Sequence, residues 1–407
     1  MRKNGVDKRL SKIDGGVCAP KGFRVGAECA GVATLAPCKA FMQPLREDIA
    51  LLVTERRYPI ACVFADDKWQ SAPVLLSKKH MRYGYARGVL ITSGIANTFG
   101  EQAYKDAFSL CAEVEKVTGI EKDELLVMST GIMGYKYPKD LFLPALRKLC
   151  ADMQDAPEKS FAMARAMMTT DKEPKQFSFA FALGDFTCTF GAVCKGGKQV
   201  SPTMATTLCV ITTDVNISAE MLQKALKTAT NDTFNMLSLD GVSSPNDTVA
   251  MFSSCKAGNY KITVPDNEYR KFVFMLTEFL SVICKALAAD GERKVCVCNV
   301  TGANSKALAK SAAKSLSAYM RGENTLGERI DVDGVVCAVL SGCAQNAYSE
   351  LSVKLCAENG SYLLFEDGNA NAGSSPLIKD ILTSDEITID VRLGKGNYKA
   401  TAYTCLR

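Results

Sequence analysis

Residues 195–214, which read KGGKQVSPTMATTLCVITTD, constrain the fold more than any other part of the sequence. A glycine pair and a proline predict a turn, and the apolar, β-branched run at 207–213 predicts a buried strand. Two small residues, Ala205 and Thr206, stand at the junction. The pattern therefore places a threonine hydroxyl at the entrance to a core strand.

Thr206 is open to two interpretations. A threonine at the start of a core strand is most often a β-former whose hydroxyl bonds to a neighbour. Alternatively, its hydroxyl attacks the carbonyl of the preceding peptide, and the α-amine that this frees becomes the base for the same hydroxyl. The small side chain of Ala205 would leave that carbonyl accessible. On residue type alone, the structural interpretation is the commoner one.

The rest of the chain alternates apolar runs with amphipathic segments. Strands are expected at 49–54, 60–64, 89–92, 125–128, 177–183, 186–194, 235–239, 294–301, 335–340, 362–365, 387–393 and 398–404, and helices at 101–118, 158–168, 218–228, 266–287 and 305–320. This alternation predicts an α/β fold with a second α/β unit in the C-terminal part. Because 407 residues exceed a single hydrophobic core, we expect two domains or one large intertwined core.

Composition excludes several classes of protein. The net charge of +5 comes from dispersed lysines and arginines, so no nucleic-acid partner is expected. The 17 cysteines lie mostly inside apolar runs, no C-x-x-C pair occurs and there is one histidine, so we expect buried thiols rather than a metal site. No apolar run suits a signal peptide or a membrane span, which predicts a cytoplasmic protein without a membrane partner.

Three further segments are candidates for the site. Residues 129–134, STGIMG, follow a predicted strand and form either a simple turn or an oxyanion-stabilising turn. Residues 169–175, TTDKEPK, are by themselves typical of a helix-capping or turn cluster. Lys195, beside glycines, is either a solvated loop residue or an anchor for an anion.

Together these segments resemble the ArgJ family, the ornithine acetyltransferases of arginine biosynthesis. The resemblance rests on STGIMG at 129–134, on TTD and PK within 169–175, and on Lys195, Gly196, Pro202, Met204, Ala205, Thr206 and the TTD at 212–214. It covers nearly the whole chain. Because several residues match at fixed spacing, it reverses the preference stated above for Thr206.

The resemblance implies a fold, a chain cut and an assembly. The fold would be the layered αββα type of ArgJ and DmpA-like proteins, with the second α/β unit at the C-terminal end. A cut between Ala205 and Thr206 would divide the chain into an alpha chain, 1–205, and a beta chain, 206–407. The two fragments would remain together as an α₂β₂ heterotetramer.

The resemblance also implies a reaction and its residues. Thr206 would be the nucleophile that moves acetyl from N2-acetylornithine to glutamate in a ping-pong mechanism, with Thr130 and Gly131 as the oxyanion hole. Substrate contacts would come from Thr169 or Thr170, from Lys195 and Thr206, and from Glu292. No metal or organic cofactor is expected, and acetyl-CoA is left open as a further acetyl donor.

Two alternatives stay open at this point. The first is an N-terminal-nucleophile amidase or aminopeptidase, in which water or an amine replaces glutamate. The second is a non-catalytic relative, suggested by Val242 in place of a family aspartate and by the missing tryptophan within 322–330. Self-cleavage and acetyl transfer distinguish these cases.

Overall fold

The computed structural model describes residues 9–65, 70–196, 207–240, 243–290, 294–321, 329–343 and 350–406. These residues divide into two compact units. One unit contains the described residues up to 230 together with 243–283, and the other contains 231–240 and those from 284 onward. Each unit has its own sheet and hydrophobic core.

The described part of the first unit forms a nine-stranded mixed sheet in the order β1-β6-β7-β8-β9-β3-β4-β5, and β2 pairs with β3. The strands are β1 (Ser11–Lys12), β2 (Phe23–Glu28), β3 (Ile49–Phe64), β4 (Tyr85–Thr92), β5 (Leu125–Ser129), β6 (Lys175–Leu183), β7 (Phe186–Lys195), β8 (Leu208–Thr213) and β9 (Thr248–Ser253). The pairs β4–β5 and β8–β9 are parallel. The expected hairpin at 177–194 is present as β6 and β7.

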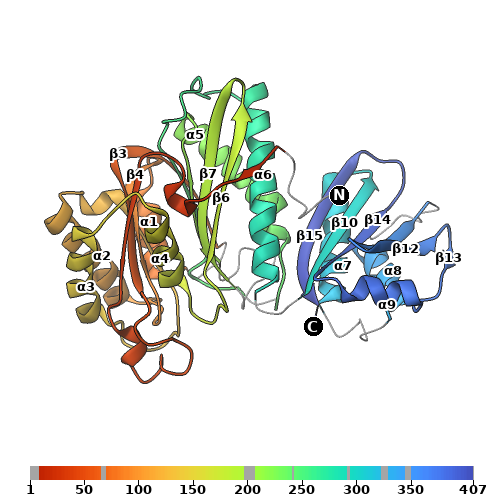
Figure 1. Cartoon of the computed structure of the whole chain (residues 1–407), viewed down its shortest axis with the longest axis horizontal. Helices are drawn as coiled ribbons and strands as arrows, with labels where there is room; N and C mark the ends of the chain where they lie inside the picture. Colours follow the sequence, from red (N-terminus) through yellow and green to blue (C-terminus); the bar gives the residue numbers. More distant parts are fainter. Residues whose placement is uncertain are drawn as a thin grey trace. The chain divides into compact units, whose positions relative to one another are not determined.

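Helices cover both faces of this sheet. They are α1 (Ala72–His80), α2 (Glu101–Thr118), α3 (Lys139–Ala151), α4 (Pro157–Met167), α5 (Ala219–Asp232) and α6 (Asn267–Ala288). Along β3, Leu51 packs with residues of α2 and α3, whereas Leu52 packs with residues of α4. This follows from the period of two in a strand, which sends successive side chains to opposite faces. Figure 1 shows α2 and α3 on one side of β3 and β4, with α4 on the other.

The strand predicted at 207–213 is β8, and all six of its residues are buried. It lies between β7 and β9, so both of its edges are paired. Aromatic packing against α6 closes one face of this region, where the Phe190 ring stacks on Phe279 at 5.1 Å between centroids. The continuous apolar run at 207–213 reflects this burial on both faces.

The second unit is a smaller α/β structure. Its described strands form a six-stranded sheet in the order β13-β12-β11-β14-β10-β15. They are β10 (Lys294–Ala303), β11 (Ser352–Ala357), β12 (Gly360–Glu366), β13 (Asn369–Ala370), β14 (Glu386–Arg392) and β15 (Tyr398–Leu406), with helices α7 (Lys306–Met320), α8 (Val332–Gly342) and α9 (Pro376–Thr383). The expected second α/β unit is therefore confirmed.

Two sequence-based predictions of strands are wrong. The run at 335–340 belongs to helix α8, because the Asp331 carboxylate caps the helix by accepting the Gly334 N–H at 3.1 Å. A short apolar run fits a buried helix as well as a strand. The segment predicted as a strand at 235–239 instead contains the 3₁₀ turn Phe234–Met236. The strands expected at 49–54 and 60–64 are one strand, β3.

Among the helices of the described ranges, none combines the length and the apolar character that a membrane span requires.

Candidate active site

The turn after β5 is held against the turn after β4. The Thr130 N–H donates to the Thr92 carbonyl at 3.0 Å, and the Ile132 N–H donates to the Gly94 carbonyl at 3.0 Å. All five residues of β5 are buried, so the strand delivers this turn from a rigid support. The backbone of 130–132 is therefore fixed before any substrate binds.

Gly131 cannot be replaced by a larger residue without moving the backbone. Its φ is +132°, and an added Cβ would lie 2.2 Å from both the carbonyl carbon and oxygen of Gly94. Within the described ranges, the Gly131 N–H donates to no other residue. A fixed N–H without a partner in the protein is the kind of donor that stabilises a developing oxyanion.

Asp171 ties the segment after α4 to the end of β7. One carboxylate oxygen accepts the Thr169 N–H at 3.1 Å, and the other accepts the Gly196 N–H at 2.8 Å. The Lys175 ammonium lies 3.2 Å from the second oxygen. This buried carboxylate therefore fixes the expected substrate segment beside Lys195.

Lys195, the last residue of β7, brings the predicted site residues together. Its ammonium donates to the Thr169 hydroxyl at 2.8 Å and to the Thr130 hydroxyl at 3.2 Å, and the residue is 4% exposed. A threonine hydroxyl has one donor and two acceptor sites, so the Thr130 oxygen accepts from Lys195 while its own hydrogen can point elsewhere. Thr130 and Gly131 thus offer two adjacent donors.

The charges of this cluster set the protonation state of Asp171. Burial would raise the pKa of Asp171, but the ammonium groups of Lys195 and Lys175, with the N–H groups of Gly196 and Thr169, lower it to about 2. Asp171 is therefore a carboxylate at neutral pH. The ammonium of Lys195 beside two hydroxyls suits an anionic group of a substrate.

The polypeptide that leads from Thr206 is also anchored in this unit. The buried Asp247 carboxylate accepts the Thr207 N–H at 2.8 Å, and the Thr207 carbonyl accepts the Thr248 N–H at 3.1 Å. Leu208, the first residue of β8, pairs with Lys195 in the antiparallel register of β7 and β8. The chain next to Thr206 therefore begins its strand beside the lysine of the site.

Not every predicted site residue falls in the described structure. Ala205, Thr206 and Glu292 lie outside the described residues. Of the two threonines proposed to contact substrate, Thr169 is buried and bonded to Lys195, whereas Thr170 is exposed. Thr169 is therefore the better placed of the pair.

Sequence reasoning missed one residue that supports the site. Arg46 is 4% exposed, and its guanidinium donates to the Met168 carbonyl at 2.7 Å. Its Nε has no hydrogen-bond partner within the described ranges. The preceding Leu45 is exposed and has a φ of +61°, so the chain reverses here and sends the arginine inward. An arginine in a polar loop gives no local signal of burial, because the loop conformation decides it.

The α/β fold brings a backbone N–H and a threonine hydroxyl, a buried lysine and the start of a core strand together, and this arrangement is typical of enzymes. The sequence matches the ArgJ family over residues 33–406. The chain belongs to that family.

Named relatives align over almost the whole chain. The Arginine biosynthesis bifunctional protein ArgJ of Caldanaerobacter subterraneus subsp. tengcongensis is 30% identical over 397 residues, which cover 97% of this chain and 96% of the relative. The protein of the same name from Symbiobacterium thermophilum is 31% identical, with 97% and 96% covered. Among solved structures, the Bacillus halodurans ArgJ protein is 26% identical with a TM-score of 0.43, covering 47% of this chain and 95% of its own.

Proposed function

We propose that this protein is a self-cleaving acetyltransferase that moves acetyl from N2-acetylornithine to glutamate. The observation that carries the proposal is the position of the Lys195 ammonium, within hydrogen-bonding distance of the hydroxyls of Thr130 and Thr169. Lys195 thus contacts the proposed oxyanion turn at 130–132 and the proposed substrate segment at 169–175, and it lies on the strand pair that leads to Thr206. Family membership supports the reaction, and the curated relatives carry the name of an arginine biosynthesis bifunctional protein.

The first step of the proposal is the cut between Ala205 and Thr206. The Thr206 hydroxyl attacks the Ala205 carbonyl, the C–N bond breaks, and the acyl group moves to oxygen as an ester while the nitrogen takes the proton. Water then hydrolyses the ester, which leaves a carboxylate on Ala205 and a free α-amine on Thr206. The anchored neighbour, Thr207, would hold this new terminus in place.

The sheet explains why the two fragments would stay together. The predicted alpha chain contains β3 and β7, and the predicted beta chain contains β8 and β9. The β7–β8 and β3–β9 pairings therefore join the two fragments by backbone hydrogen bonds within one sheet. We further propose that the pair assembles as an α₂β₂ heterotetramer.

In the acetyl-transfer step, the Thr206 hydroxyl attacks the acetyl carbonyl and gives its proton to its own α-amine. The Thr130 hydroxyl and the Gly131 N–H stabilise the oxyanion. The acetyl C–N bond then breaks, the α-amine returns the proton to the departing ornithine nitrogen, and an acetyl-threonine ester remains. The amine of glutamate attacks this ester and restores the Thr206 hydroxyl.

Substrate recognition would use opposite charges. The Lys195 ammonium, beside the Thr169 hydroxyl, would bind the carboxylate of the amino-acid substrate. Glu292 would bind the side-chain ammonium of ornithine. This chemistry needs no metal or organic cofactor, and acetyl-CoA is a further donor to be tested. The proposed compartment is the cytoplasm, because all 17 cysteines are free thiols.

A denaturing gel and an acceptor assay test the proposal together. We expect two fragments near half length on the gel, and mass spectrometry should show that one of them begins at Thr206. We also expect that ornithine release depends on glutamate. Release of acetate without glutamate would favour the amidase alternative. A single full-length species without turnover would favour the non-catalytic relative and contradict the proposal.

A further inference from the structure

A cavity of about 710 Å³ lies at the end of β5 opposite to the oxyanion turn. Its lining residues come from β3, the end of α1, the connection from α1 to β4, the start of β4, α2 and the turn before β5. This volume lies within the range of small-molecule sites, which is about 300–1,000 Å³. No residue of the proposed reaction contributes to it.

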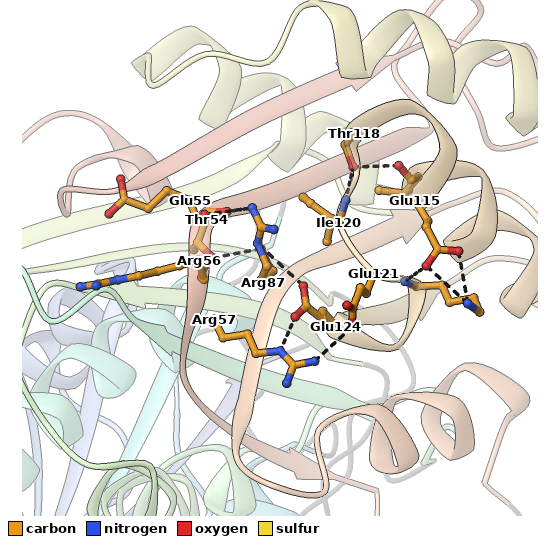
Figure 2. A network of polar contacts seen from close by, with 12 residues as sticks. Thr54, Glu55, Arg56, Arg57, Arg87, Glu115, Thr118, Ile120, Glu121 and Glu124 are labelled. Carbon is orange, nitrogen blue, oxygen red and sulfur yellow. Dashed lines mark hydrogen bonds and ion pairs between the residues drawn. The ribbon is translucent and has the colours of Figure 1, made fainter.

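Part of the charge around this cavity is already neutralised. Figure 2 shows the Glu124 carboxylate between Arg57 and Arg87, and it accepts a hydrogen bond from the Arg57 Nε. The Arg87 Nε lies 3.9 Å from the second oxygen of Glu124. Lys122 pairs with Glu115 at 3.2 Å. Of these residues, Arg57, Lys122 and Glu124 line the cavity, and their ion pairs hold them in place.

Two other cations of the lining have no such balance. Lys79 and Arg82 form no ion pair with any carboxylate in the described part of the chain. Asp123 is the remaining carboxylate of the lining, so four cations and two carboxylates face the cavity. Since Arg57 and Lys122 are paired in the wall, Lys79 and Arg82 are offset only by Asp123, and the cavity keeps a net positive charge.

Aromatic rings lie beside these cations. Tyr83, Tyr85 and Phe108 line the cavity and are 74%, 42% and 37% exposed. The Arg82 guanidinium lies 4.5 Å from the centroid of the Tyr83 ring. Flat apolar faces beside an unbalanced guanidinium favour a planar ring that carries a negative group.

The single histidine of the chain, His80, adds a hydrogen-bond acceptor to the cavity. The His80 Nδ1 lies 2.7 Å from the Leu125 carbonyl, so Nδ1 carries the hydrogen and Nε2 is an acceptor. Burial lowers the pKa of His80, which keeps the ring neutral. His80 also lines the cavity, where an acceptor suits a hydroxyl or an amino group of a ligand.

We propose that this cavity binds a nucleoside monophosphate. A phosphate monoester carries about −1.5 to −2 charges at neutral pH and has three acceptor oxygens, so one phosphate group can bond to Lys79 and Arg82 at the same time. The base would stack on Tyr83, Tyr85 or Phe108. This site is separate from the acetyl-transfer site, so it is tested independently of the proposed reaction.

Calorimetric titration of the full protein with adenosine monophosphate tests the proposal. Saturable binding is expected. Adenosine and inorganic phosphate should each bind more weakly, because adenosine lacks the phosphate and inorganic phosphate lacks the base. Lys79→Ala combined with Arg82→Ala should weaken binding about tenfold or more, since each charge-assisted bond is worth more than a neutral one. Tyr83→Leu should weaken the nucleotide but leave phosphate binding unchanged.

Lys78→Ala is the matched control, because Lys78 lies on the same turn of α1 and bonds to Gln70 instead of lining the cavity. It should change the affinity by less than about twofold. Absence of binding at about 5 mM nucleotide would overturn the proposal. Equal affinity in the double variant and the wild-type protein would overturn it as well.

Discussion

Gly131→Ala is the sharpest test of the oxyanion turn. The alanine Cβ would lie 2.2 Å from the carbonyl carbon and oxygen of Gly94, and both are backbone atoms that cannot rotate away. The turn must therefore shift, and the Ile132–Gly94 hydrogen bond that holds it must lengthen. Because the proposed oxyanion donor is the N–H of residue 131 itself, this shift moves the donor out of position.

The size of the effect follows from the donor that is lost. Removal of one oxyanion-hole donor lowers kcat by about 10²–10³, and we expect this loss in acetyl transfer. A non-glycine residue at φ of +132° also costs about 1–3 kcal/mol of stability. The assay is ornithine release from N2-acetylornithine with glutamate as acceptor, normalised to the cleaved fraction on a denaturing gel.

Gly134→Ala is the matched control in the same turn. Gly134 also has a positive φ, +87°, but an added Cβ would meet no atom within 4 Å. It should share the backbone strain and keep kcat within about threefold, because no donor moves. Equal activity of the two variants, after correction for folded and cleaved protein, would refute the assignment of the Gly131 N–H.

Four further predictions address other parts of the site. Lys195→Met should raise the KM for N2-acetylornithine about tenfold or more by removing the charge opposite the substrate carboxylate, and an unchanged KM would contradict this role. Thr206→Ala should abolish both chain cleavage, measured on a denaturing gel, and acetyl transfer, measured by ornithine release. Thr206→Ser should keep some of each. A Thr206→Ala protein that still cleaves and still transfers acetyl would disprove the assignment of Thr206 as the nucleophile. The pKa of Asp171 falls from its ordinary value of 3.8 to about 2 on folding, so its contribution to stability is present above pH 4 and is lost as the pH falls towards 2. Urea midpoints measured between pH 6 and 3 should therefore fall more steeply in the wild-type protein than in Asp171→Asn, and parallel curves would contradict the charge pairing. Arg46→Met should raise the KM for N2-acetylornithine, because the Met168 carbonyl loses the hydrogen bond from Arg46. Arg46→Lys keeps a donor and should raise this KM less. An equal rise of KM in both variants would contradict a role of this hydrogen bond.

The sequence by itself determined the elements with strong local signals. The helix expected at 101–118 matches α2, and the hairpin expected at 177–194 matches β6 and β7. Amphipathic periodicity and turn residues act over a few neighbours, so a single sequence carries them. The same holds for the turn at 129–134, whose glycine and threonine stand directly after a buried strand.

Only the tertiary structure decided which residues meet. Lys195 contacts Thr130 and Thr169, which lie 65 and 26 positions away in the sequence, and the paired strands and the Asp171 bonds set those distances. The inward turn of Arg46 and the helix at 335–340 were likewise decided by packing and capping rather than by local composition. Strand order and register depend on the whole core, and a local pattern does not contain that information.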